Sequence, residues 1–124
     1  MLSDNVSVAT VAVKDMAAAA RFYEGILGLT RVHTEGEGAI EYATKGGTLL
    51  VYLSQFAGTN RATAVSWNVG DELPRLVQYL KMKGVTFEHY DFPGMTRDGD
   101  IHLGGGRKNA WFKDPDGNIH ALVA

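Results

Sequence analysis

Apolar residues recur every three or four positions in two stretches of the chain, and each stretch is preceded by a short segment with the spacing of a strand. The helical spacing covers residues 16–27 and 72–83. The segments before them, 7–13 and 63–69, are rich in valine and threonine and place apolar side chains at alternate positions. The pattern therefore predicts a strand followed by a helix in each half of the chain.

The residues at the ends of both predicted helices are those that start and stop helices. Asp15 and Asp71 stand just before them and are suited to accept hydrogen bonds from the first free N–H groups. Gly28 and Gly84 follow them and supply the positive φ of a helix C-terminus. After each helix the pattern predicts three further strands, at residues 29–35, 39–44 and 48–54 in the first half and 86–90, 109–113 and 118–123 in the second.

The two halves repeat one pattern. Aligning Asp15 with Asp71 also aligns Tyr23 with Tyr79, and further identities lie on either side. Each half then has the order strand, helix and three strands, which is a βαβββ module. One such module covers only one face of its sheet, so we expect the two modules to fold together.

The repeat predicts a single domain over residues 1–124, made of modules at about 5–54 and 63–124 with residues 55–62 as the linker. The expected fold class is α+β. In it the two modules form a curved eight-stranded mixed sheet around a cleft, with the helices on the outer face. The second module contains residues 93–107 in addition, and we expect them to form a loop over the cleft. The sequence does not decide whether this loop acts as a lid. The glycine-rich residues 103–109, which overlap the end of this loop, are expected to be a flexible hinge.

Composition narrows the class of protein. The 124 residues are 45% hydrophobic, which is enough for the core of one domain. The net charge of −2 provides no basic surface for nucleic acid or an anionic membrane, and no apolar run reaches the ~18 residues of a spanning helix. The first residues lack the order of a signal peptide. The chain has no cysteine, which excludes disulfides and thiolate chemistry, and we expect a cytoplasmic protein without nucleic-acid or membrane partners.

Three segments carry a resemblance to a known family: VAVKDMAAAARFYEGILGL (11–29), NVGDELPRLVQYLKMKGVTF (68–87) and AWFKDPDGN (110–118). They resemble the vicinal oxygen chelate superfamily, which includes glyoxalase I, extradiol dioxygenases and bleomycin-resistance proteins. The resemblance implies that a metal enzyme of this kind would take His, Gln or Glu ligands from the first and last strands of each module. The ion would act as a Lewis acid. The resemblance also implies a homodimer, whose modules pair within one chain or are exchanged between chains.

The four positions that match the metal ligands of the family are Val8, Tyr52, Ala64 and Ala121. Valine and alanine have no donor atom, and a neutral tyrosine is a poor ligand. Because a metal site needs three or four protein groups, we expect no metal and no cofactor in this chain. Catalytic residues stay unknown.

Other titratable side chains offer little for catalysis. His120 is next to a former ligand position, but the alternation of strand side chains turns it toward the helices, as it does Trp67 and Phe112. His89 and His102 flank the extra segment and are expected to be solvated. A displaced metal site, kept as an alternative, would draw on these histidines with Glu88, Asp98 and Asp100.

The same alternation selects the side chains that would line the cleft. They form a floor of small residues with aromatic walls, which suits a flat, mostly apolar ligand that a few polar groups orient. The predicted ligand-binding residues are Val8, Thr10, Leu50, Tyr52, Ala64, Ser66, Asn68, Tyr90, Phe92, Trp111 and Ala121.

The sequence thus favours a metal-independent binding protein of the bleomycin-resistance type. It would sequester a flat aromatic drug or metabolite, with a role in antibiotic resistance. One alternative is a glyoxalase-like lyase, isomerase or dioxygenase with a divalent metal at displaced ligands. Another is a regulatory or structural protein in which Trp111 and Tyr52 fill a vestigial cleft. The sequence does not decide which ligand is bound or whether a reaction is catalysed.

Overall fold

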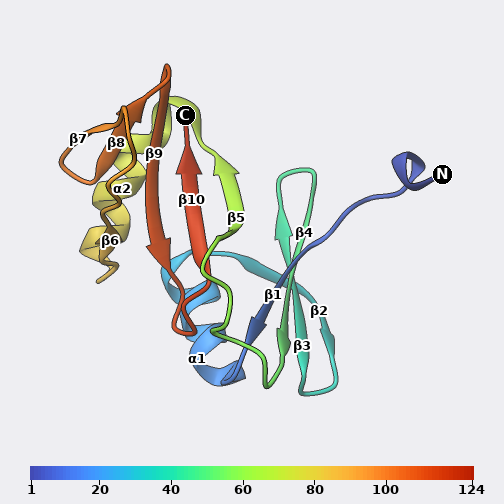
Figure 1. The fold of residues 1–124 in the computed structure, drawn as a ribbon. Helices are drawn as coiled ribbons and strands as arrows, with labels where there is room; N and C mark the ends of the chain where they lie inside the picture. Colours follow the sequence, from blue (N-terminus) through green and yellow to red (C-terminus); the bar gives the residue numbers. More distant parts are fainter. The chain divides into compact units, whose positions relative to one another are not determined.

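The computed structural model describes residues 1–124 and contains two compact units, each built on its own sheet (Figure 1). The first unit comprises Met1–Arg61 together with Pro115–Asn118, and the second comprises Ala62–Asp114 together with Ile119–Ala124. The α+β class and the two strand–helix–strand modules are confirmed. The strands are divided between a sheet of four and a sheet of six.

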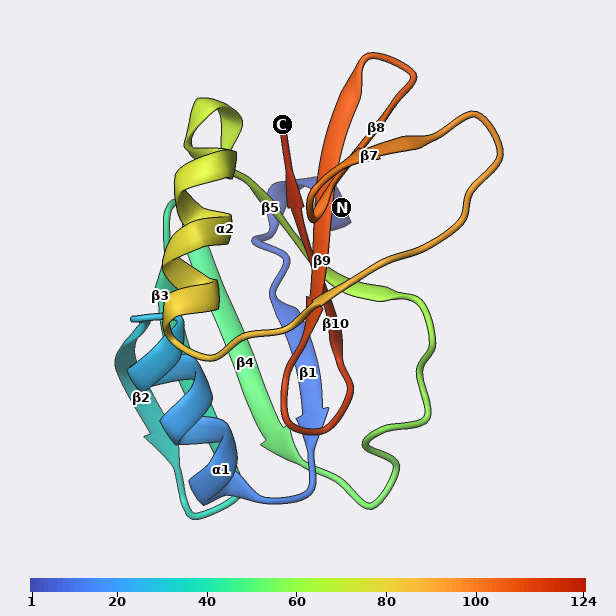
Figure 2. The same cartoon turned by 90° about the vertical axis from the view of Figure 1, so that its left-hand side faces the viewer.

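The first unit has the predicted βαβββ order. Its sheet has the strand order β1-β4-β3-β2, in which β1 and β4 are parallel and the other pairs are antiparallel. A helix lies across one face of this sheet (Figure 2). The elements are β1 (Ala9–Val13), α1 (Met16–Ala20) continued by a π-helical segment (Arg21–Ile26), β2 (Thr30–Glu35), β3 (Ala39–Thr44) and β4 (Gly47–Leu53).

The second unit repeats this order and adds a hairpin. Its sheet runs β5-β10-β9-β8-β7, with β6 also paired to β9, and the β5–β10 pair is parallel like β1–β4. The helix α2 lies along one face of this sheet (Figure 2). The elements are β5 (Thr63–Asn68), α2 (Leu73–Met82), β6 (Phe87–Glu88), β7 (Thr96–Asp98), β8 (Ile101–Gly104), β9 (Arg107–Lys113) and β10 (Ile119–Val123).

The extra segment of the second unit is not the loop that the sequence predicted. Residues 93–107 contain β7 and β8, which pair with each other and extend the sheet from β9. Gly105 and Gly106, with φ of 59° and 74°, form the two-residue turn between β8 and β9. Such a tight turn requires positive φ at both central positions. Residues 103–109, expected to be a flexible hinge, are thus the end of β8, this turn and the start of β9. The strand expected at 86–90 shrinks to the two residues of β6.

One of the two predicted helix caps is confirmed. The Asp15 carboxylate accepts a hydrogen bond from the Ala18 N–H at 3.1 Å. The cap predicted at Asp71 is wrong, because Gly70–Glu72 form a 3₁₀ turn and α2 begins only at Leu73. The positive φ of Gly70, 56°, opens this additional turn before the helix. Gly28 and Gly84 have the positive φ values, 73° and 94°, that were expected after the helices.

The core of the first unit lies between its helix and its sheet. Tyr23 stacks on Tyr42 of β3, with 5.9 Å between ring centroids. The Tyr42 hydroxyl donates to Glu24 Oε2 at 2.9 Å, and Arg31 donates to the same oxygen at 2.7 Å. The Asn118 amide donates to the Ala12 carbonyl at 2.8 Å, which fastens the Pro115–Asn118 segment to β1. The turn near the end of the chain is therefore part of the first unit.

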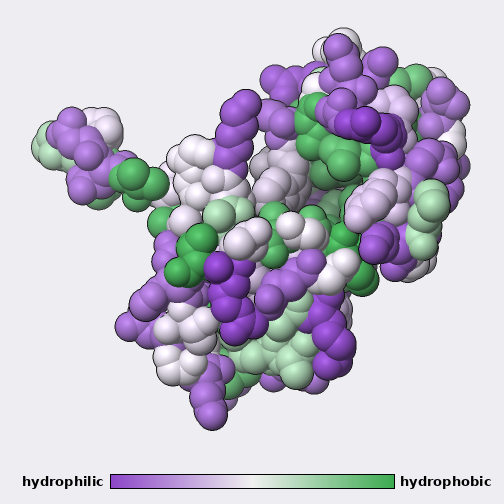
Figure 3. Space-filling view, turned by 180° about the vertical axis from the view of Figure 1, so that it is seen from behind, coloured by the Kyte–Doolittle hydropathy of each residue, from purple (hydrophilic) through white to green (hydrophobic).

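The N-terminal residues contribute nothing to this core. Leu2 and Val6 are exposed, and Figure 3 shows the segment standing away from β1 with apolar atoms on its surface. Neither helix of the structure combines the length and apolar character that crossing a bilayer requires.

The core of the second unit contains a buried histidine. His120 of β10 is fully buried on the face that α2 covers, where its ring stacks on Phe112 at 5.0 Å. The Trp67 indole N–H donates to His120 Nδ1 at 3.0 Å. The predicted orientation of Trp67, Phe112 and His120 is thus confirmed. Burial lowers the pKa of His120 to about 4, because the charged imidazolium would lose its hydration.

The burial of His120 makes stability depend on pH. As the pH falls from about 6.5 to about 4, the unfolded chain takes up a proton that folded His120 does not, so the free energy of unfolding decreases. The decrease reaches roughly 2–4 kcal/mol at about 1.36 kcal/mol per pKa unit. Urea unfolding at pH 7.5, 6 and 4.5 measures it. His120→Gln is expected to flatten this slope, whereas exposed His33→Gln keeps it. Equal slopes in the two variants would contradict this assignment.

Candidate ligand-binding faces

Each sheet has one face covered by its helix and one face turned away from it, which we call the open face. On the open face of the second unit, Ala121 of β10 is in register with Ser66 of β5 on one side and Trp111 of β9 on the other. Glu88 of β6 follows beyond Trp111 in the same row. A small central residue is therefore flanked by a hydroxyl and an indole ring.

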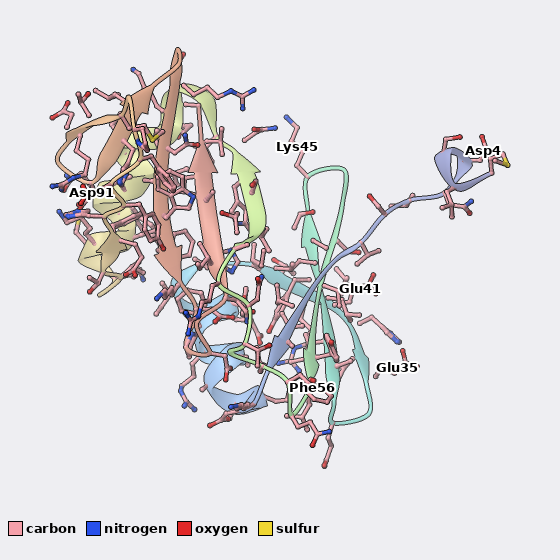
Figure 4. The ribbon with its side chains drawn as sticks, viewed as in Figure 1. Asp4, Glu35, Glu41, Lys45, Phe56 and Asp91 are labelled. Carbon is pink, nitrogen blue, oxygen red and sulfur yellow. The ribbon has the colours of Figure 1, made fainter.

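Three rings gather around Trp111 on this open face. We call Tyr90, Phe92, His102 and Trp111 the aromatic cluster. The Trp111 ring lies 4.7 Å from His102, 5.4 Å from Tyr90 and 5.7 Å from Phe92, measured between centroids. Tyr90 and Phe92 flank Asp91, which Figure 4 labels, in the irregular segment between β6 and β7. The structure brings the predicted residues Tyr90, Phe92 and Trp111 together, and their role in binding a ligand stays a prediction.

His102 is a member of the cluster that the sequence missed. It was expected to be solvated, but its side chain is fully buried. It lies opposite Asn109 in the β8–β9 pair, and the backbone N–H of Tyr90 donates to its Nε2 at 3.0 Å. The short Ile101–Gly104 strand followed by a double-glycine turn is a hairpin signal that identifies this position on the Trp111 face.

The two polar residues predicted on β5 lie as expected. Ser66 and Asn68 are exposed on the open face, where Asn68 is in register with Val123. Ala64 lies beside them at the point where the β5–β10 register shifts. These side chains lie on the same sheet as the aromatic cluster but are not members of the cluster.

Two of the three carboxylates proposed for a displaced metal site, Glu88 and Asp100, form ion pairs with lysines. Lys113 Nζ lies 3.3 Å from Glu88, and Lys81 Nζ lies 2.8 Å from Asp100. Asp100 also contacts His89 Nε2 at 2.7 Å. The bond from Lys81, followed by that from His89, holds the pKa of Asp100 below its usual range. The structure shows no cluster of three or more histidine and acidic side chains that could hold an ion.

The four positions that the family uses for metal ligands do not fit a divalent ion. Val8 precedes β1, and Tyr52 is exposed on β4 opposite Ala12. Ala64 and Ala121 present only methyl groups on the second sheet. A phenol and three hydrocarbon side chains supply no set of strong donors. No chemical step is therefore derived through a metal.

The open face of the first unit is less aromatic. Thr10 and Leu50 are in register, and Glu41 of β3 and His33 of β2 continue the row. Glu41 is labelled in Figure 4 together with Glu35 of β2. The sequence-based prediction did not include Glu41, because the predicted residues of this module lie on its first and last strands. The alternation of Glu41 with buried Ile40 and Tyr42 indicates its face. Tyr52 is the single aromatic ring predicted on this face.

The chain belongs to the Glyoxalase/Bleomycin resistance protein/Dioxygenase superfamily. The family model with this description matches residues 5–122, which is nearly the full length of the chain. A search of curated proteins finds no match to the chain.

Several solved structures are similar to this chain. A bleomycin resistance determinant encoded on transposon Tn5 is 20% identical, with 96% of each chain covered and a TM-score of 0.72. Oxidase ChaP-H2 is 25% identical over 97% of this chain and 92% of its own, with a TM-score of 0.68. The fosfomycin resistance protein FosX from Mesorhizobium loti is 13% identical over 98% and 92%, with a TM-score of 0.69. These similarities show the fold.

The segment that carries Tyr90 and Phe92 depends on a glycine in β8. A Cβ at Gly104 would lie 2.9 Å from Met95 Cγ and 3.2 Å from the Gly94 carbonyl oxygen. We therefore expect Gly104→Ala to lower the free energy of unfolding by about 1–3 kcal/mol, as overpacking does.

The matched control is Gly25→Ala, where a new Cβ meets nothing within 4 Å. This helical substitution is expected to be neutral or to stabilise by about 0.5–1 kcal/mol. Urea unfolding of both variants measures the difference. Equal stability of the two variants would show that the Gly104 contact is not restrictive.

Proposed function

We propose that this chain is a metal-independent small-molecule binding protein that sequesters a flat, largely aromatic drug or metabolite. The observation that carries the proposal is the aromatic cluster beside Ala121 on the open face of the second unit. Trp111 of this cluster lies beside Ala121, the position at which the resemblance to metal enzymes of the superfamily implies a ligand to the ion. The similarity to a bleomycin resistance determinant supports a role of the same kind.

Aromatic stacking supplies sufficient affinity for such a role. Each well-placed ring pair adds about 0.5–1.5 kcal/mol beyond the burial of apolar area. Phe92 is 48% exposed and Tyr90 and Trp111 are partly exposed, so these rings present surface to solvent. Two or three such contacts, together with burial of a drug-sized molecule, are compatible with micromolar affinity, roughly −8 kcal/mol. Sequestration requires no covalent step.

Polar groups on the same sheet would orient the ligand. Ser66 and Asn68 on the open face of β5 are exposed, and Glu88 lies next to Trp111 in the row. Pockets for small molecules combine apolar walls with a few such groups. On the first unit, Val8, Thr10, Leu50 and Tyr52 remain proposed ligand contacts. We further propose that the protein acts as a homodimer, with its modules paired within one chain or exchanged between chains.

Metal content tests the metal-independent part of the proposal. Untagged protein is incubated with zinc, nickel, manganese and iron(II), desalted, and analysed for bound ions by mass spectrometry, with a known zinc enzyme treated in parallel. We expect far less than one ion per chain, because three of the four matching positions have no donor atom. About one ion per chain would instead support a glyoxalase-like enzyme with displaced ligands.

Ligand titration tests the binding part. A panel of flat aromatic compounds is screened by the shift in melting temperature, and the affinities of hits are measured by calorimetry. Trp111→Ala is expected to weaken binding at least about tenfold, which corresponds to about 1.4 kcal/mol. Phe56→Ala is the control, because Phe56 is a 68% exposed ring between β4 and β5, labelled in Figure 4. No shift with any member of the panel would count against the proposal.

A further inference from the structure

Two polar atoms inside the aromatic cluster are buried and have no hydrogen-bonding partner in the protein. They are the hydroxyl of Tyr90 and Nδ1 of His102. The His102 side chain as a whole is fully buried. Buried polar groups in proteins are nearly always hydrogen-bonded, so two unpaired atoms in one cluster require an explanation. A ligand that bonds to them would supply it.

The hydrogen bond at Nε2 of His102 determines whether Nδ1 donates or accepts. The backbone N–H of Tyr90 is a donor and points to Nε2 at 3.0 Å, so Nε2 must carry a lone pair. In a neutral imidazole the proton then lies on Nδ1. His102 therefore presents a buried N–H donor that no protein group accepts.

The Tyr90 hydroxyl is a donor as well. Burial raises the pKa of Tyr90, and the neighbouring Glu88 carboxylate raises it further, although Lys113 acts in the opposite direction. The hydroxyl thus keeps its proton at neutral pH. The Tyr90 ring lies 6.3 Å from the His102 ring and 5.4 Å from Trp111, so both donors belong to groups packed around one indole.

Phe92 is the outermost member of the cluster. It is the only one of the four rings whose side chain is largely exposed, and it contacts Tyr90 at 5.9 Å and Trp111 at 5.7 Å. It is carried by the irregular segment between β6 and β7. A planar ligand that takes the place of the Phe92 ring would contact Tyr90 and Trp111, the two rings that Phe92 contacts in the free protein.

We propose that the ligand is a planar aromatic compound with an oxygen acceptor, a ring carbonyl or phenolate, that accepts hydrogen bonds from His102 Nδ1–H and the Tyr90 hydroxyl. This inference rests on the proposed function and names the chemistry that the same face selects. Because both groups donate, an amine or a cation finds no acceptor at His102. A site that bonds an oxygen also discriminates against the analogue that lacks it, since its donors would stay unpaired.

The experiment compares two soluble probes that differ only in their ring oxygens, anthraquinone-2-sulfonate and anthracene-2-sulfonate. Calorimetry on the whole chain is expected to give at least about tenfold tighter binding of the quinone, as for the loss of a hydrogen bond to a buried donor. Tyr90→Phe keeps the ring and the backbone N–H and removes only the hydroxyl. This substitution is expected to weaken binding of the quinone severalfold and to leave the affinity for the anthracene unchanged. Tyr79→Phe, at an exposed position of α2, is the matched control and should change neither affinity.

The stability of the free variants provides a second measurement that needs no ligand. Removing an unpaired hydroxyl leaves the melting temperature of Tyr90→Phe equal to or above that of the wild type. A melting temperature clearly below that of Tyr79→Phe would show that the hydroxyl has a structural partner and would overturn the inference.

The binding results separate the two proposals. Equal affinity of the two probes would overturn the proposal of an oxygen acceptor but not the proposal that the protein binds aromatic compounds. Failure of both probes to bind, together with no response to the wider panel, overturns both. Preference for the quinone that is lost in Tyr90→Phe supports the inference.

Discussion

The position of β10 between β5 and β9 is the constraint on which the second unit depends. Because this strand is paired on both edges, its alternate side chains are committed to opposite faces. His120 and Leu122 go to the face that α2 covers, and Ala121 goes to the open face. A shift of one residue would place a histidine in the open face and an alanine in the core. The Trp67–His120 hydrogen bond fixes the register that the hydrophobic pattern selects.

The second unit contains two buried histidines whose surroundings have different consequences. His120 accepts from an indole and packs flat on Phe112, so it is a part of the core. His102 is equally buried, but only its Nε2 has a partner in the protein. Proteins rarely leave such a donor unpaired, and functional sites are where they do so. The contrast separates the structural face of the sheet from the face that we propose binds a ligand.

Because the two units repeat one pattern, a difference between their open faces can be traced to the residues that only one unit has. Both units share the parallel pairing of their first and last strands. The first unit presents Leu50, Tyr52 and Glu41 on its open face and has no ring cluster there. The second unit gains His102 from the added hairpin and Tyr90 and Phe92 from the segment that leads into it. The insertion that distinguishes the second copy is thus also what builds the aromatic cluster.

The sequence by itself determined the modules, the faces of their strands and the identity of the family. Helical spacing, Asp15, Gly28 and Gly84 act locally, so they are readable without knowing what the chain packs against. Strand alternation is also local, and it placed Trp111, Ala121 and His120 on their faces. The side chains at the four metal positions are read directly from the chain.

Only the tertiary structure decided the features that depend on distant partners. The pairing of β7 with β8, and of β8 with β9, turned an expected loop into strands and buried His102. Local signals are weak in strands of three or four residues, and pairing with the neighbouring strand of the sheet provides their stability. The 3₁₀ turn at Gly70 likewise displaced the cap expected at Asp71. The unpaired donors of Tyr90 and His102 are visible only when every neighbour is known, because an unmet hydrogen bond is a property of the surroundings and not of the residue.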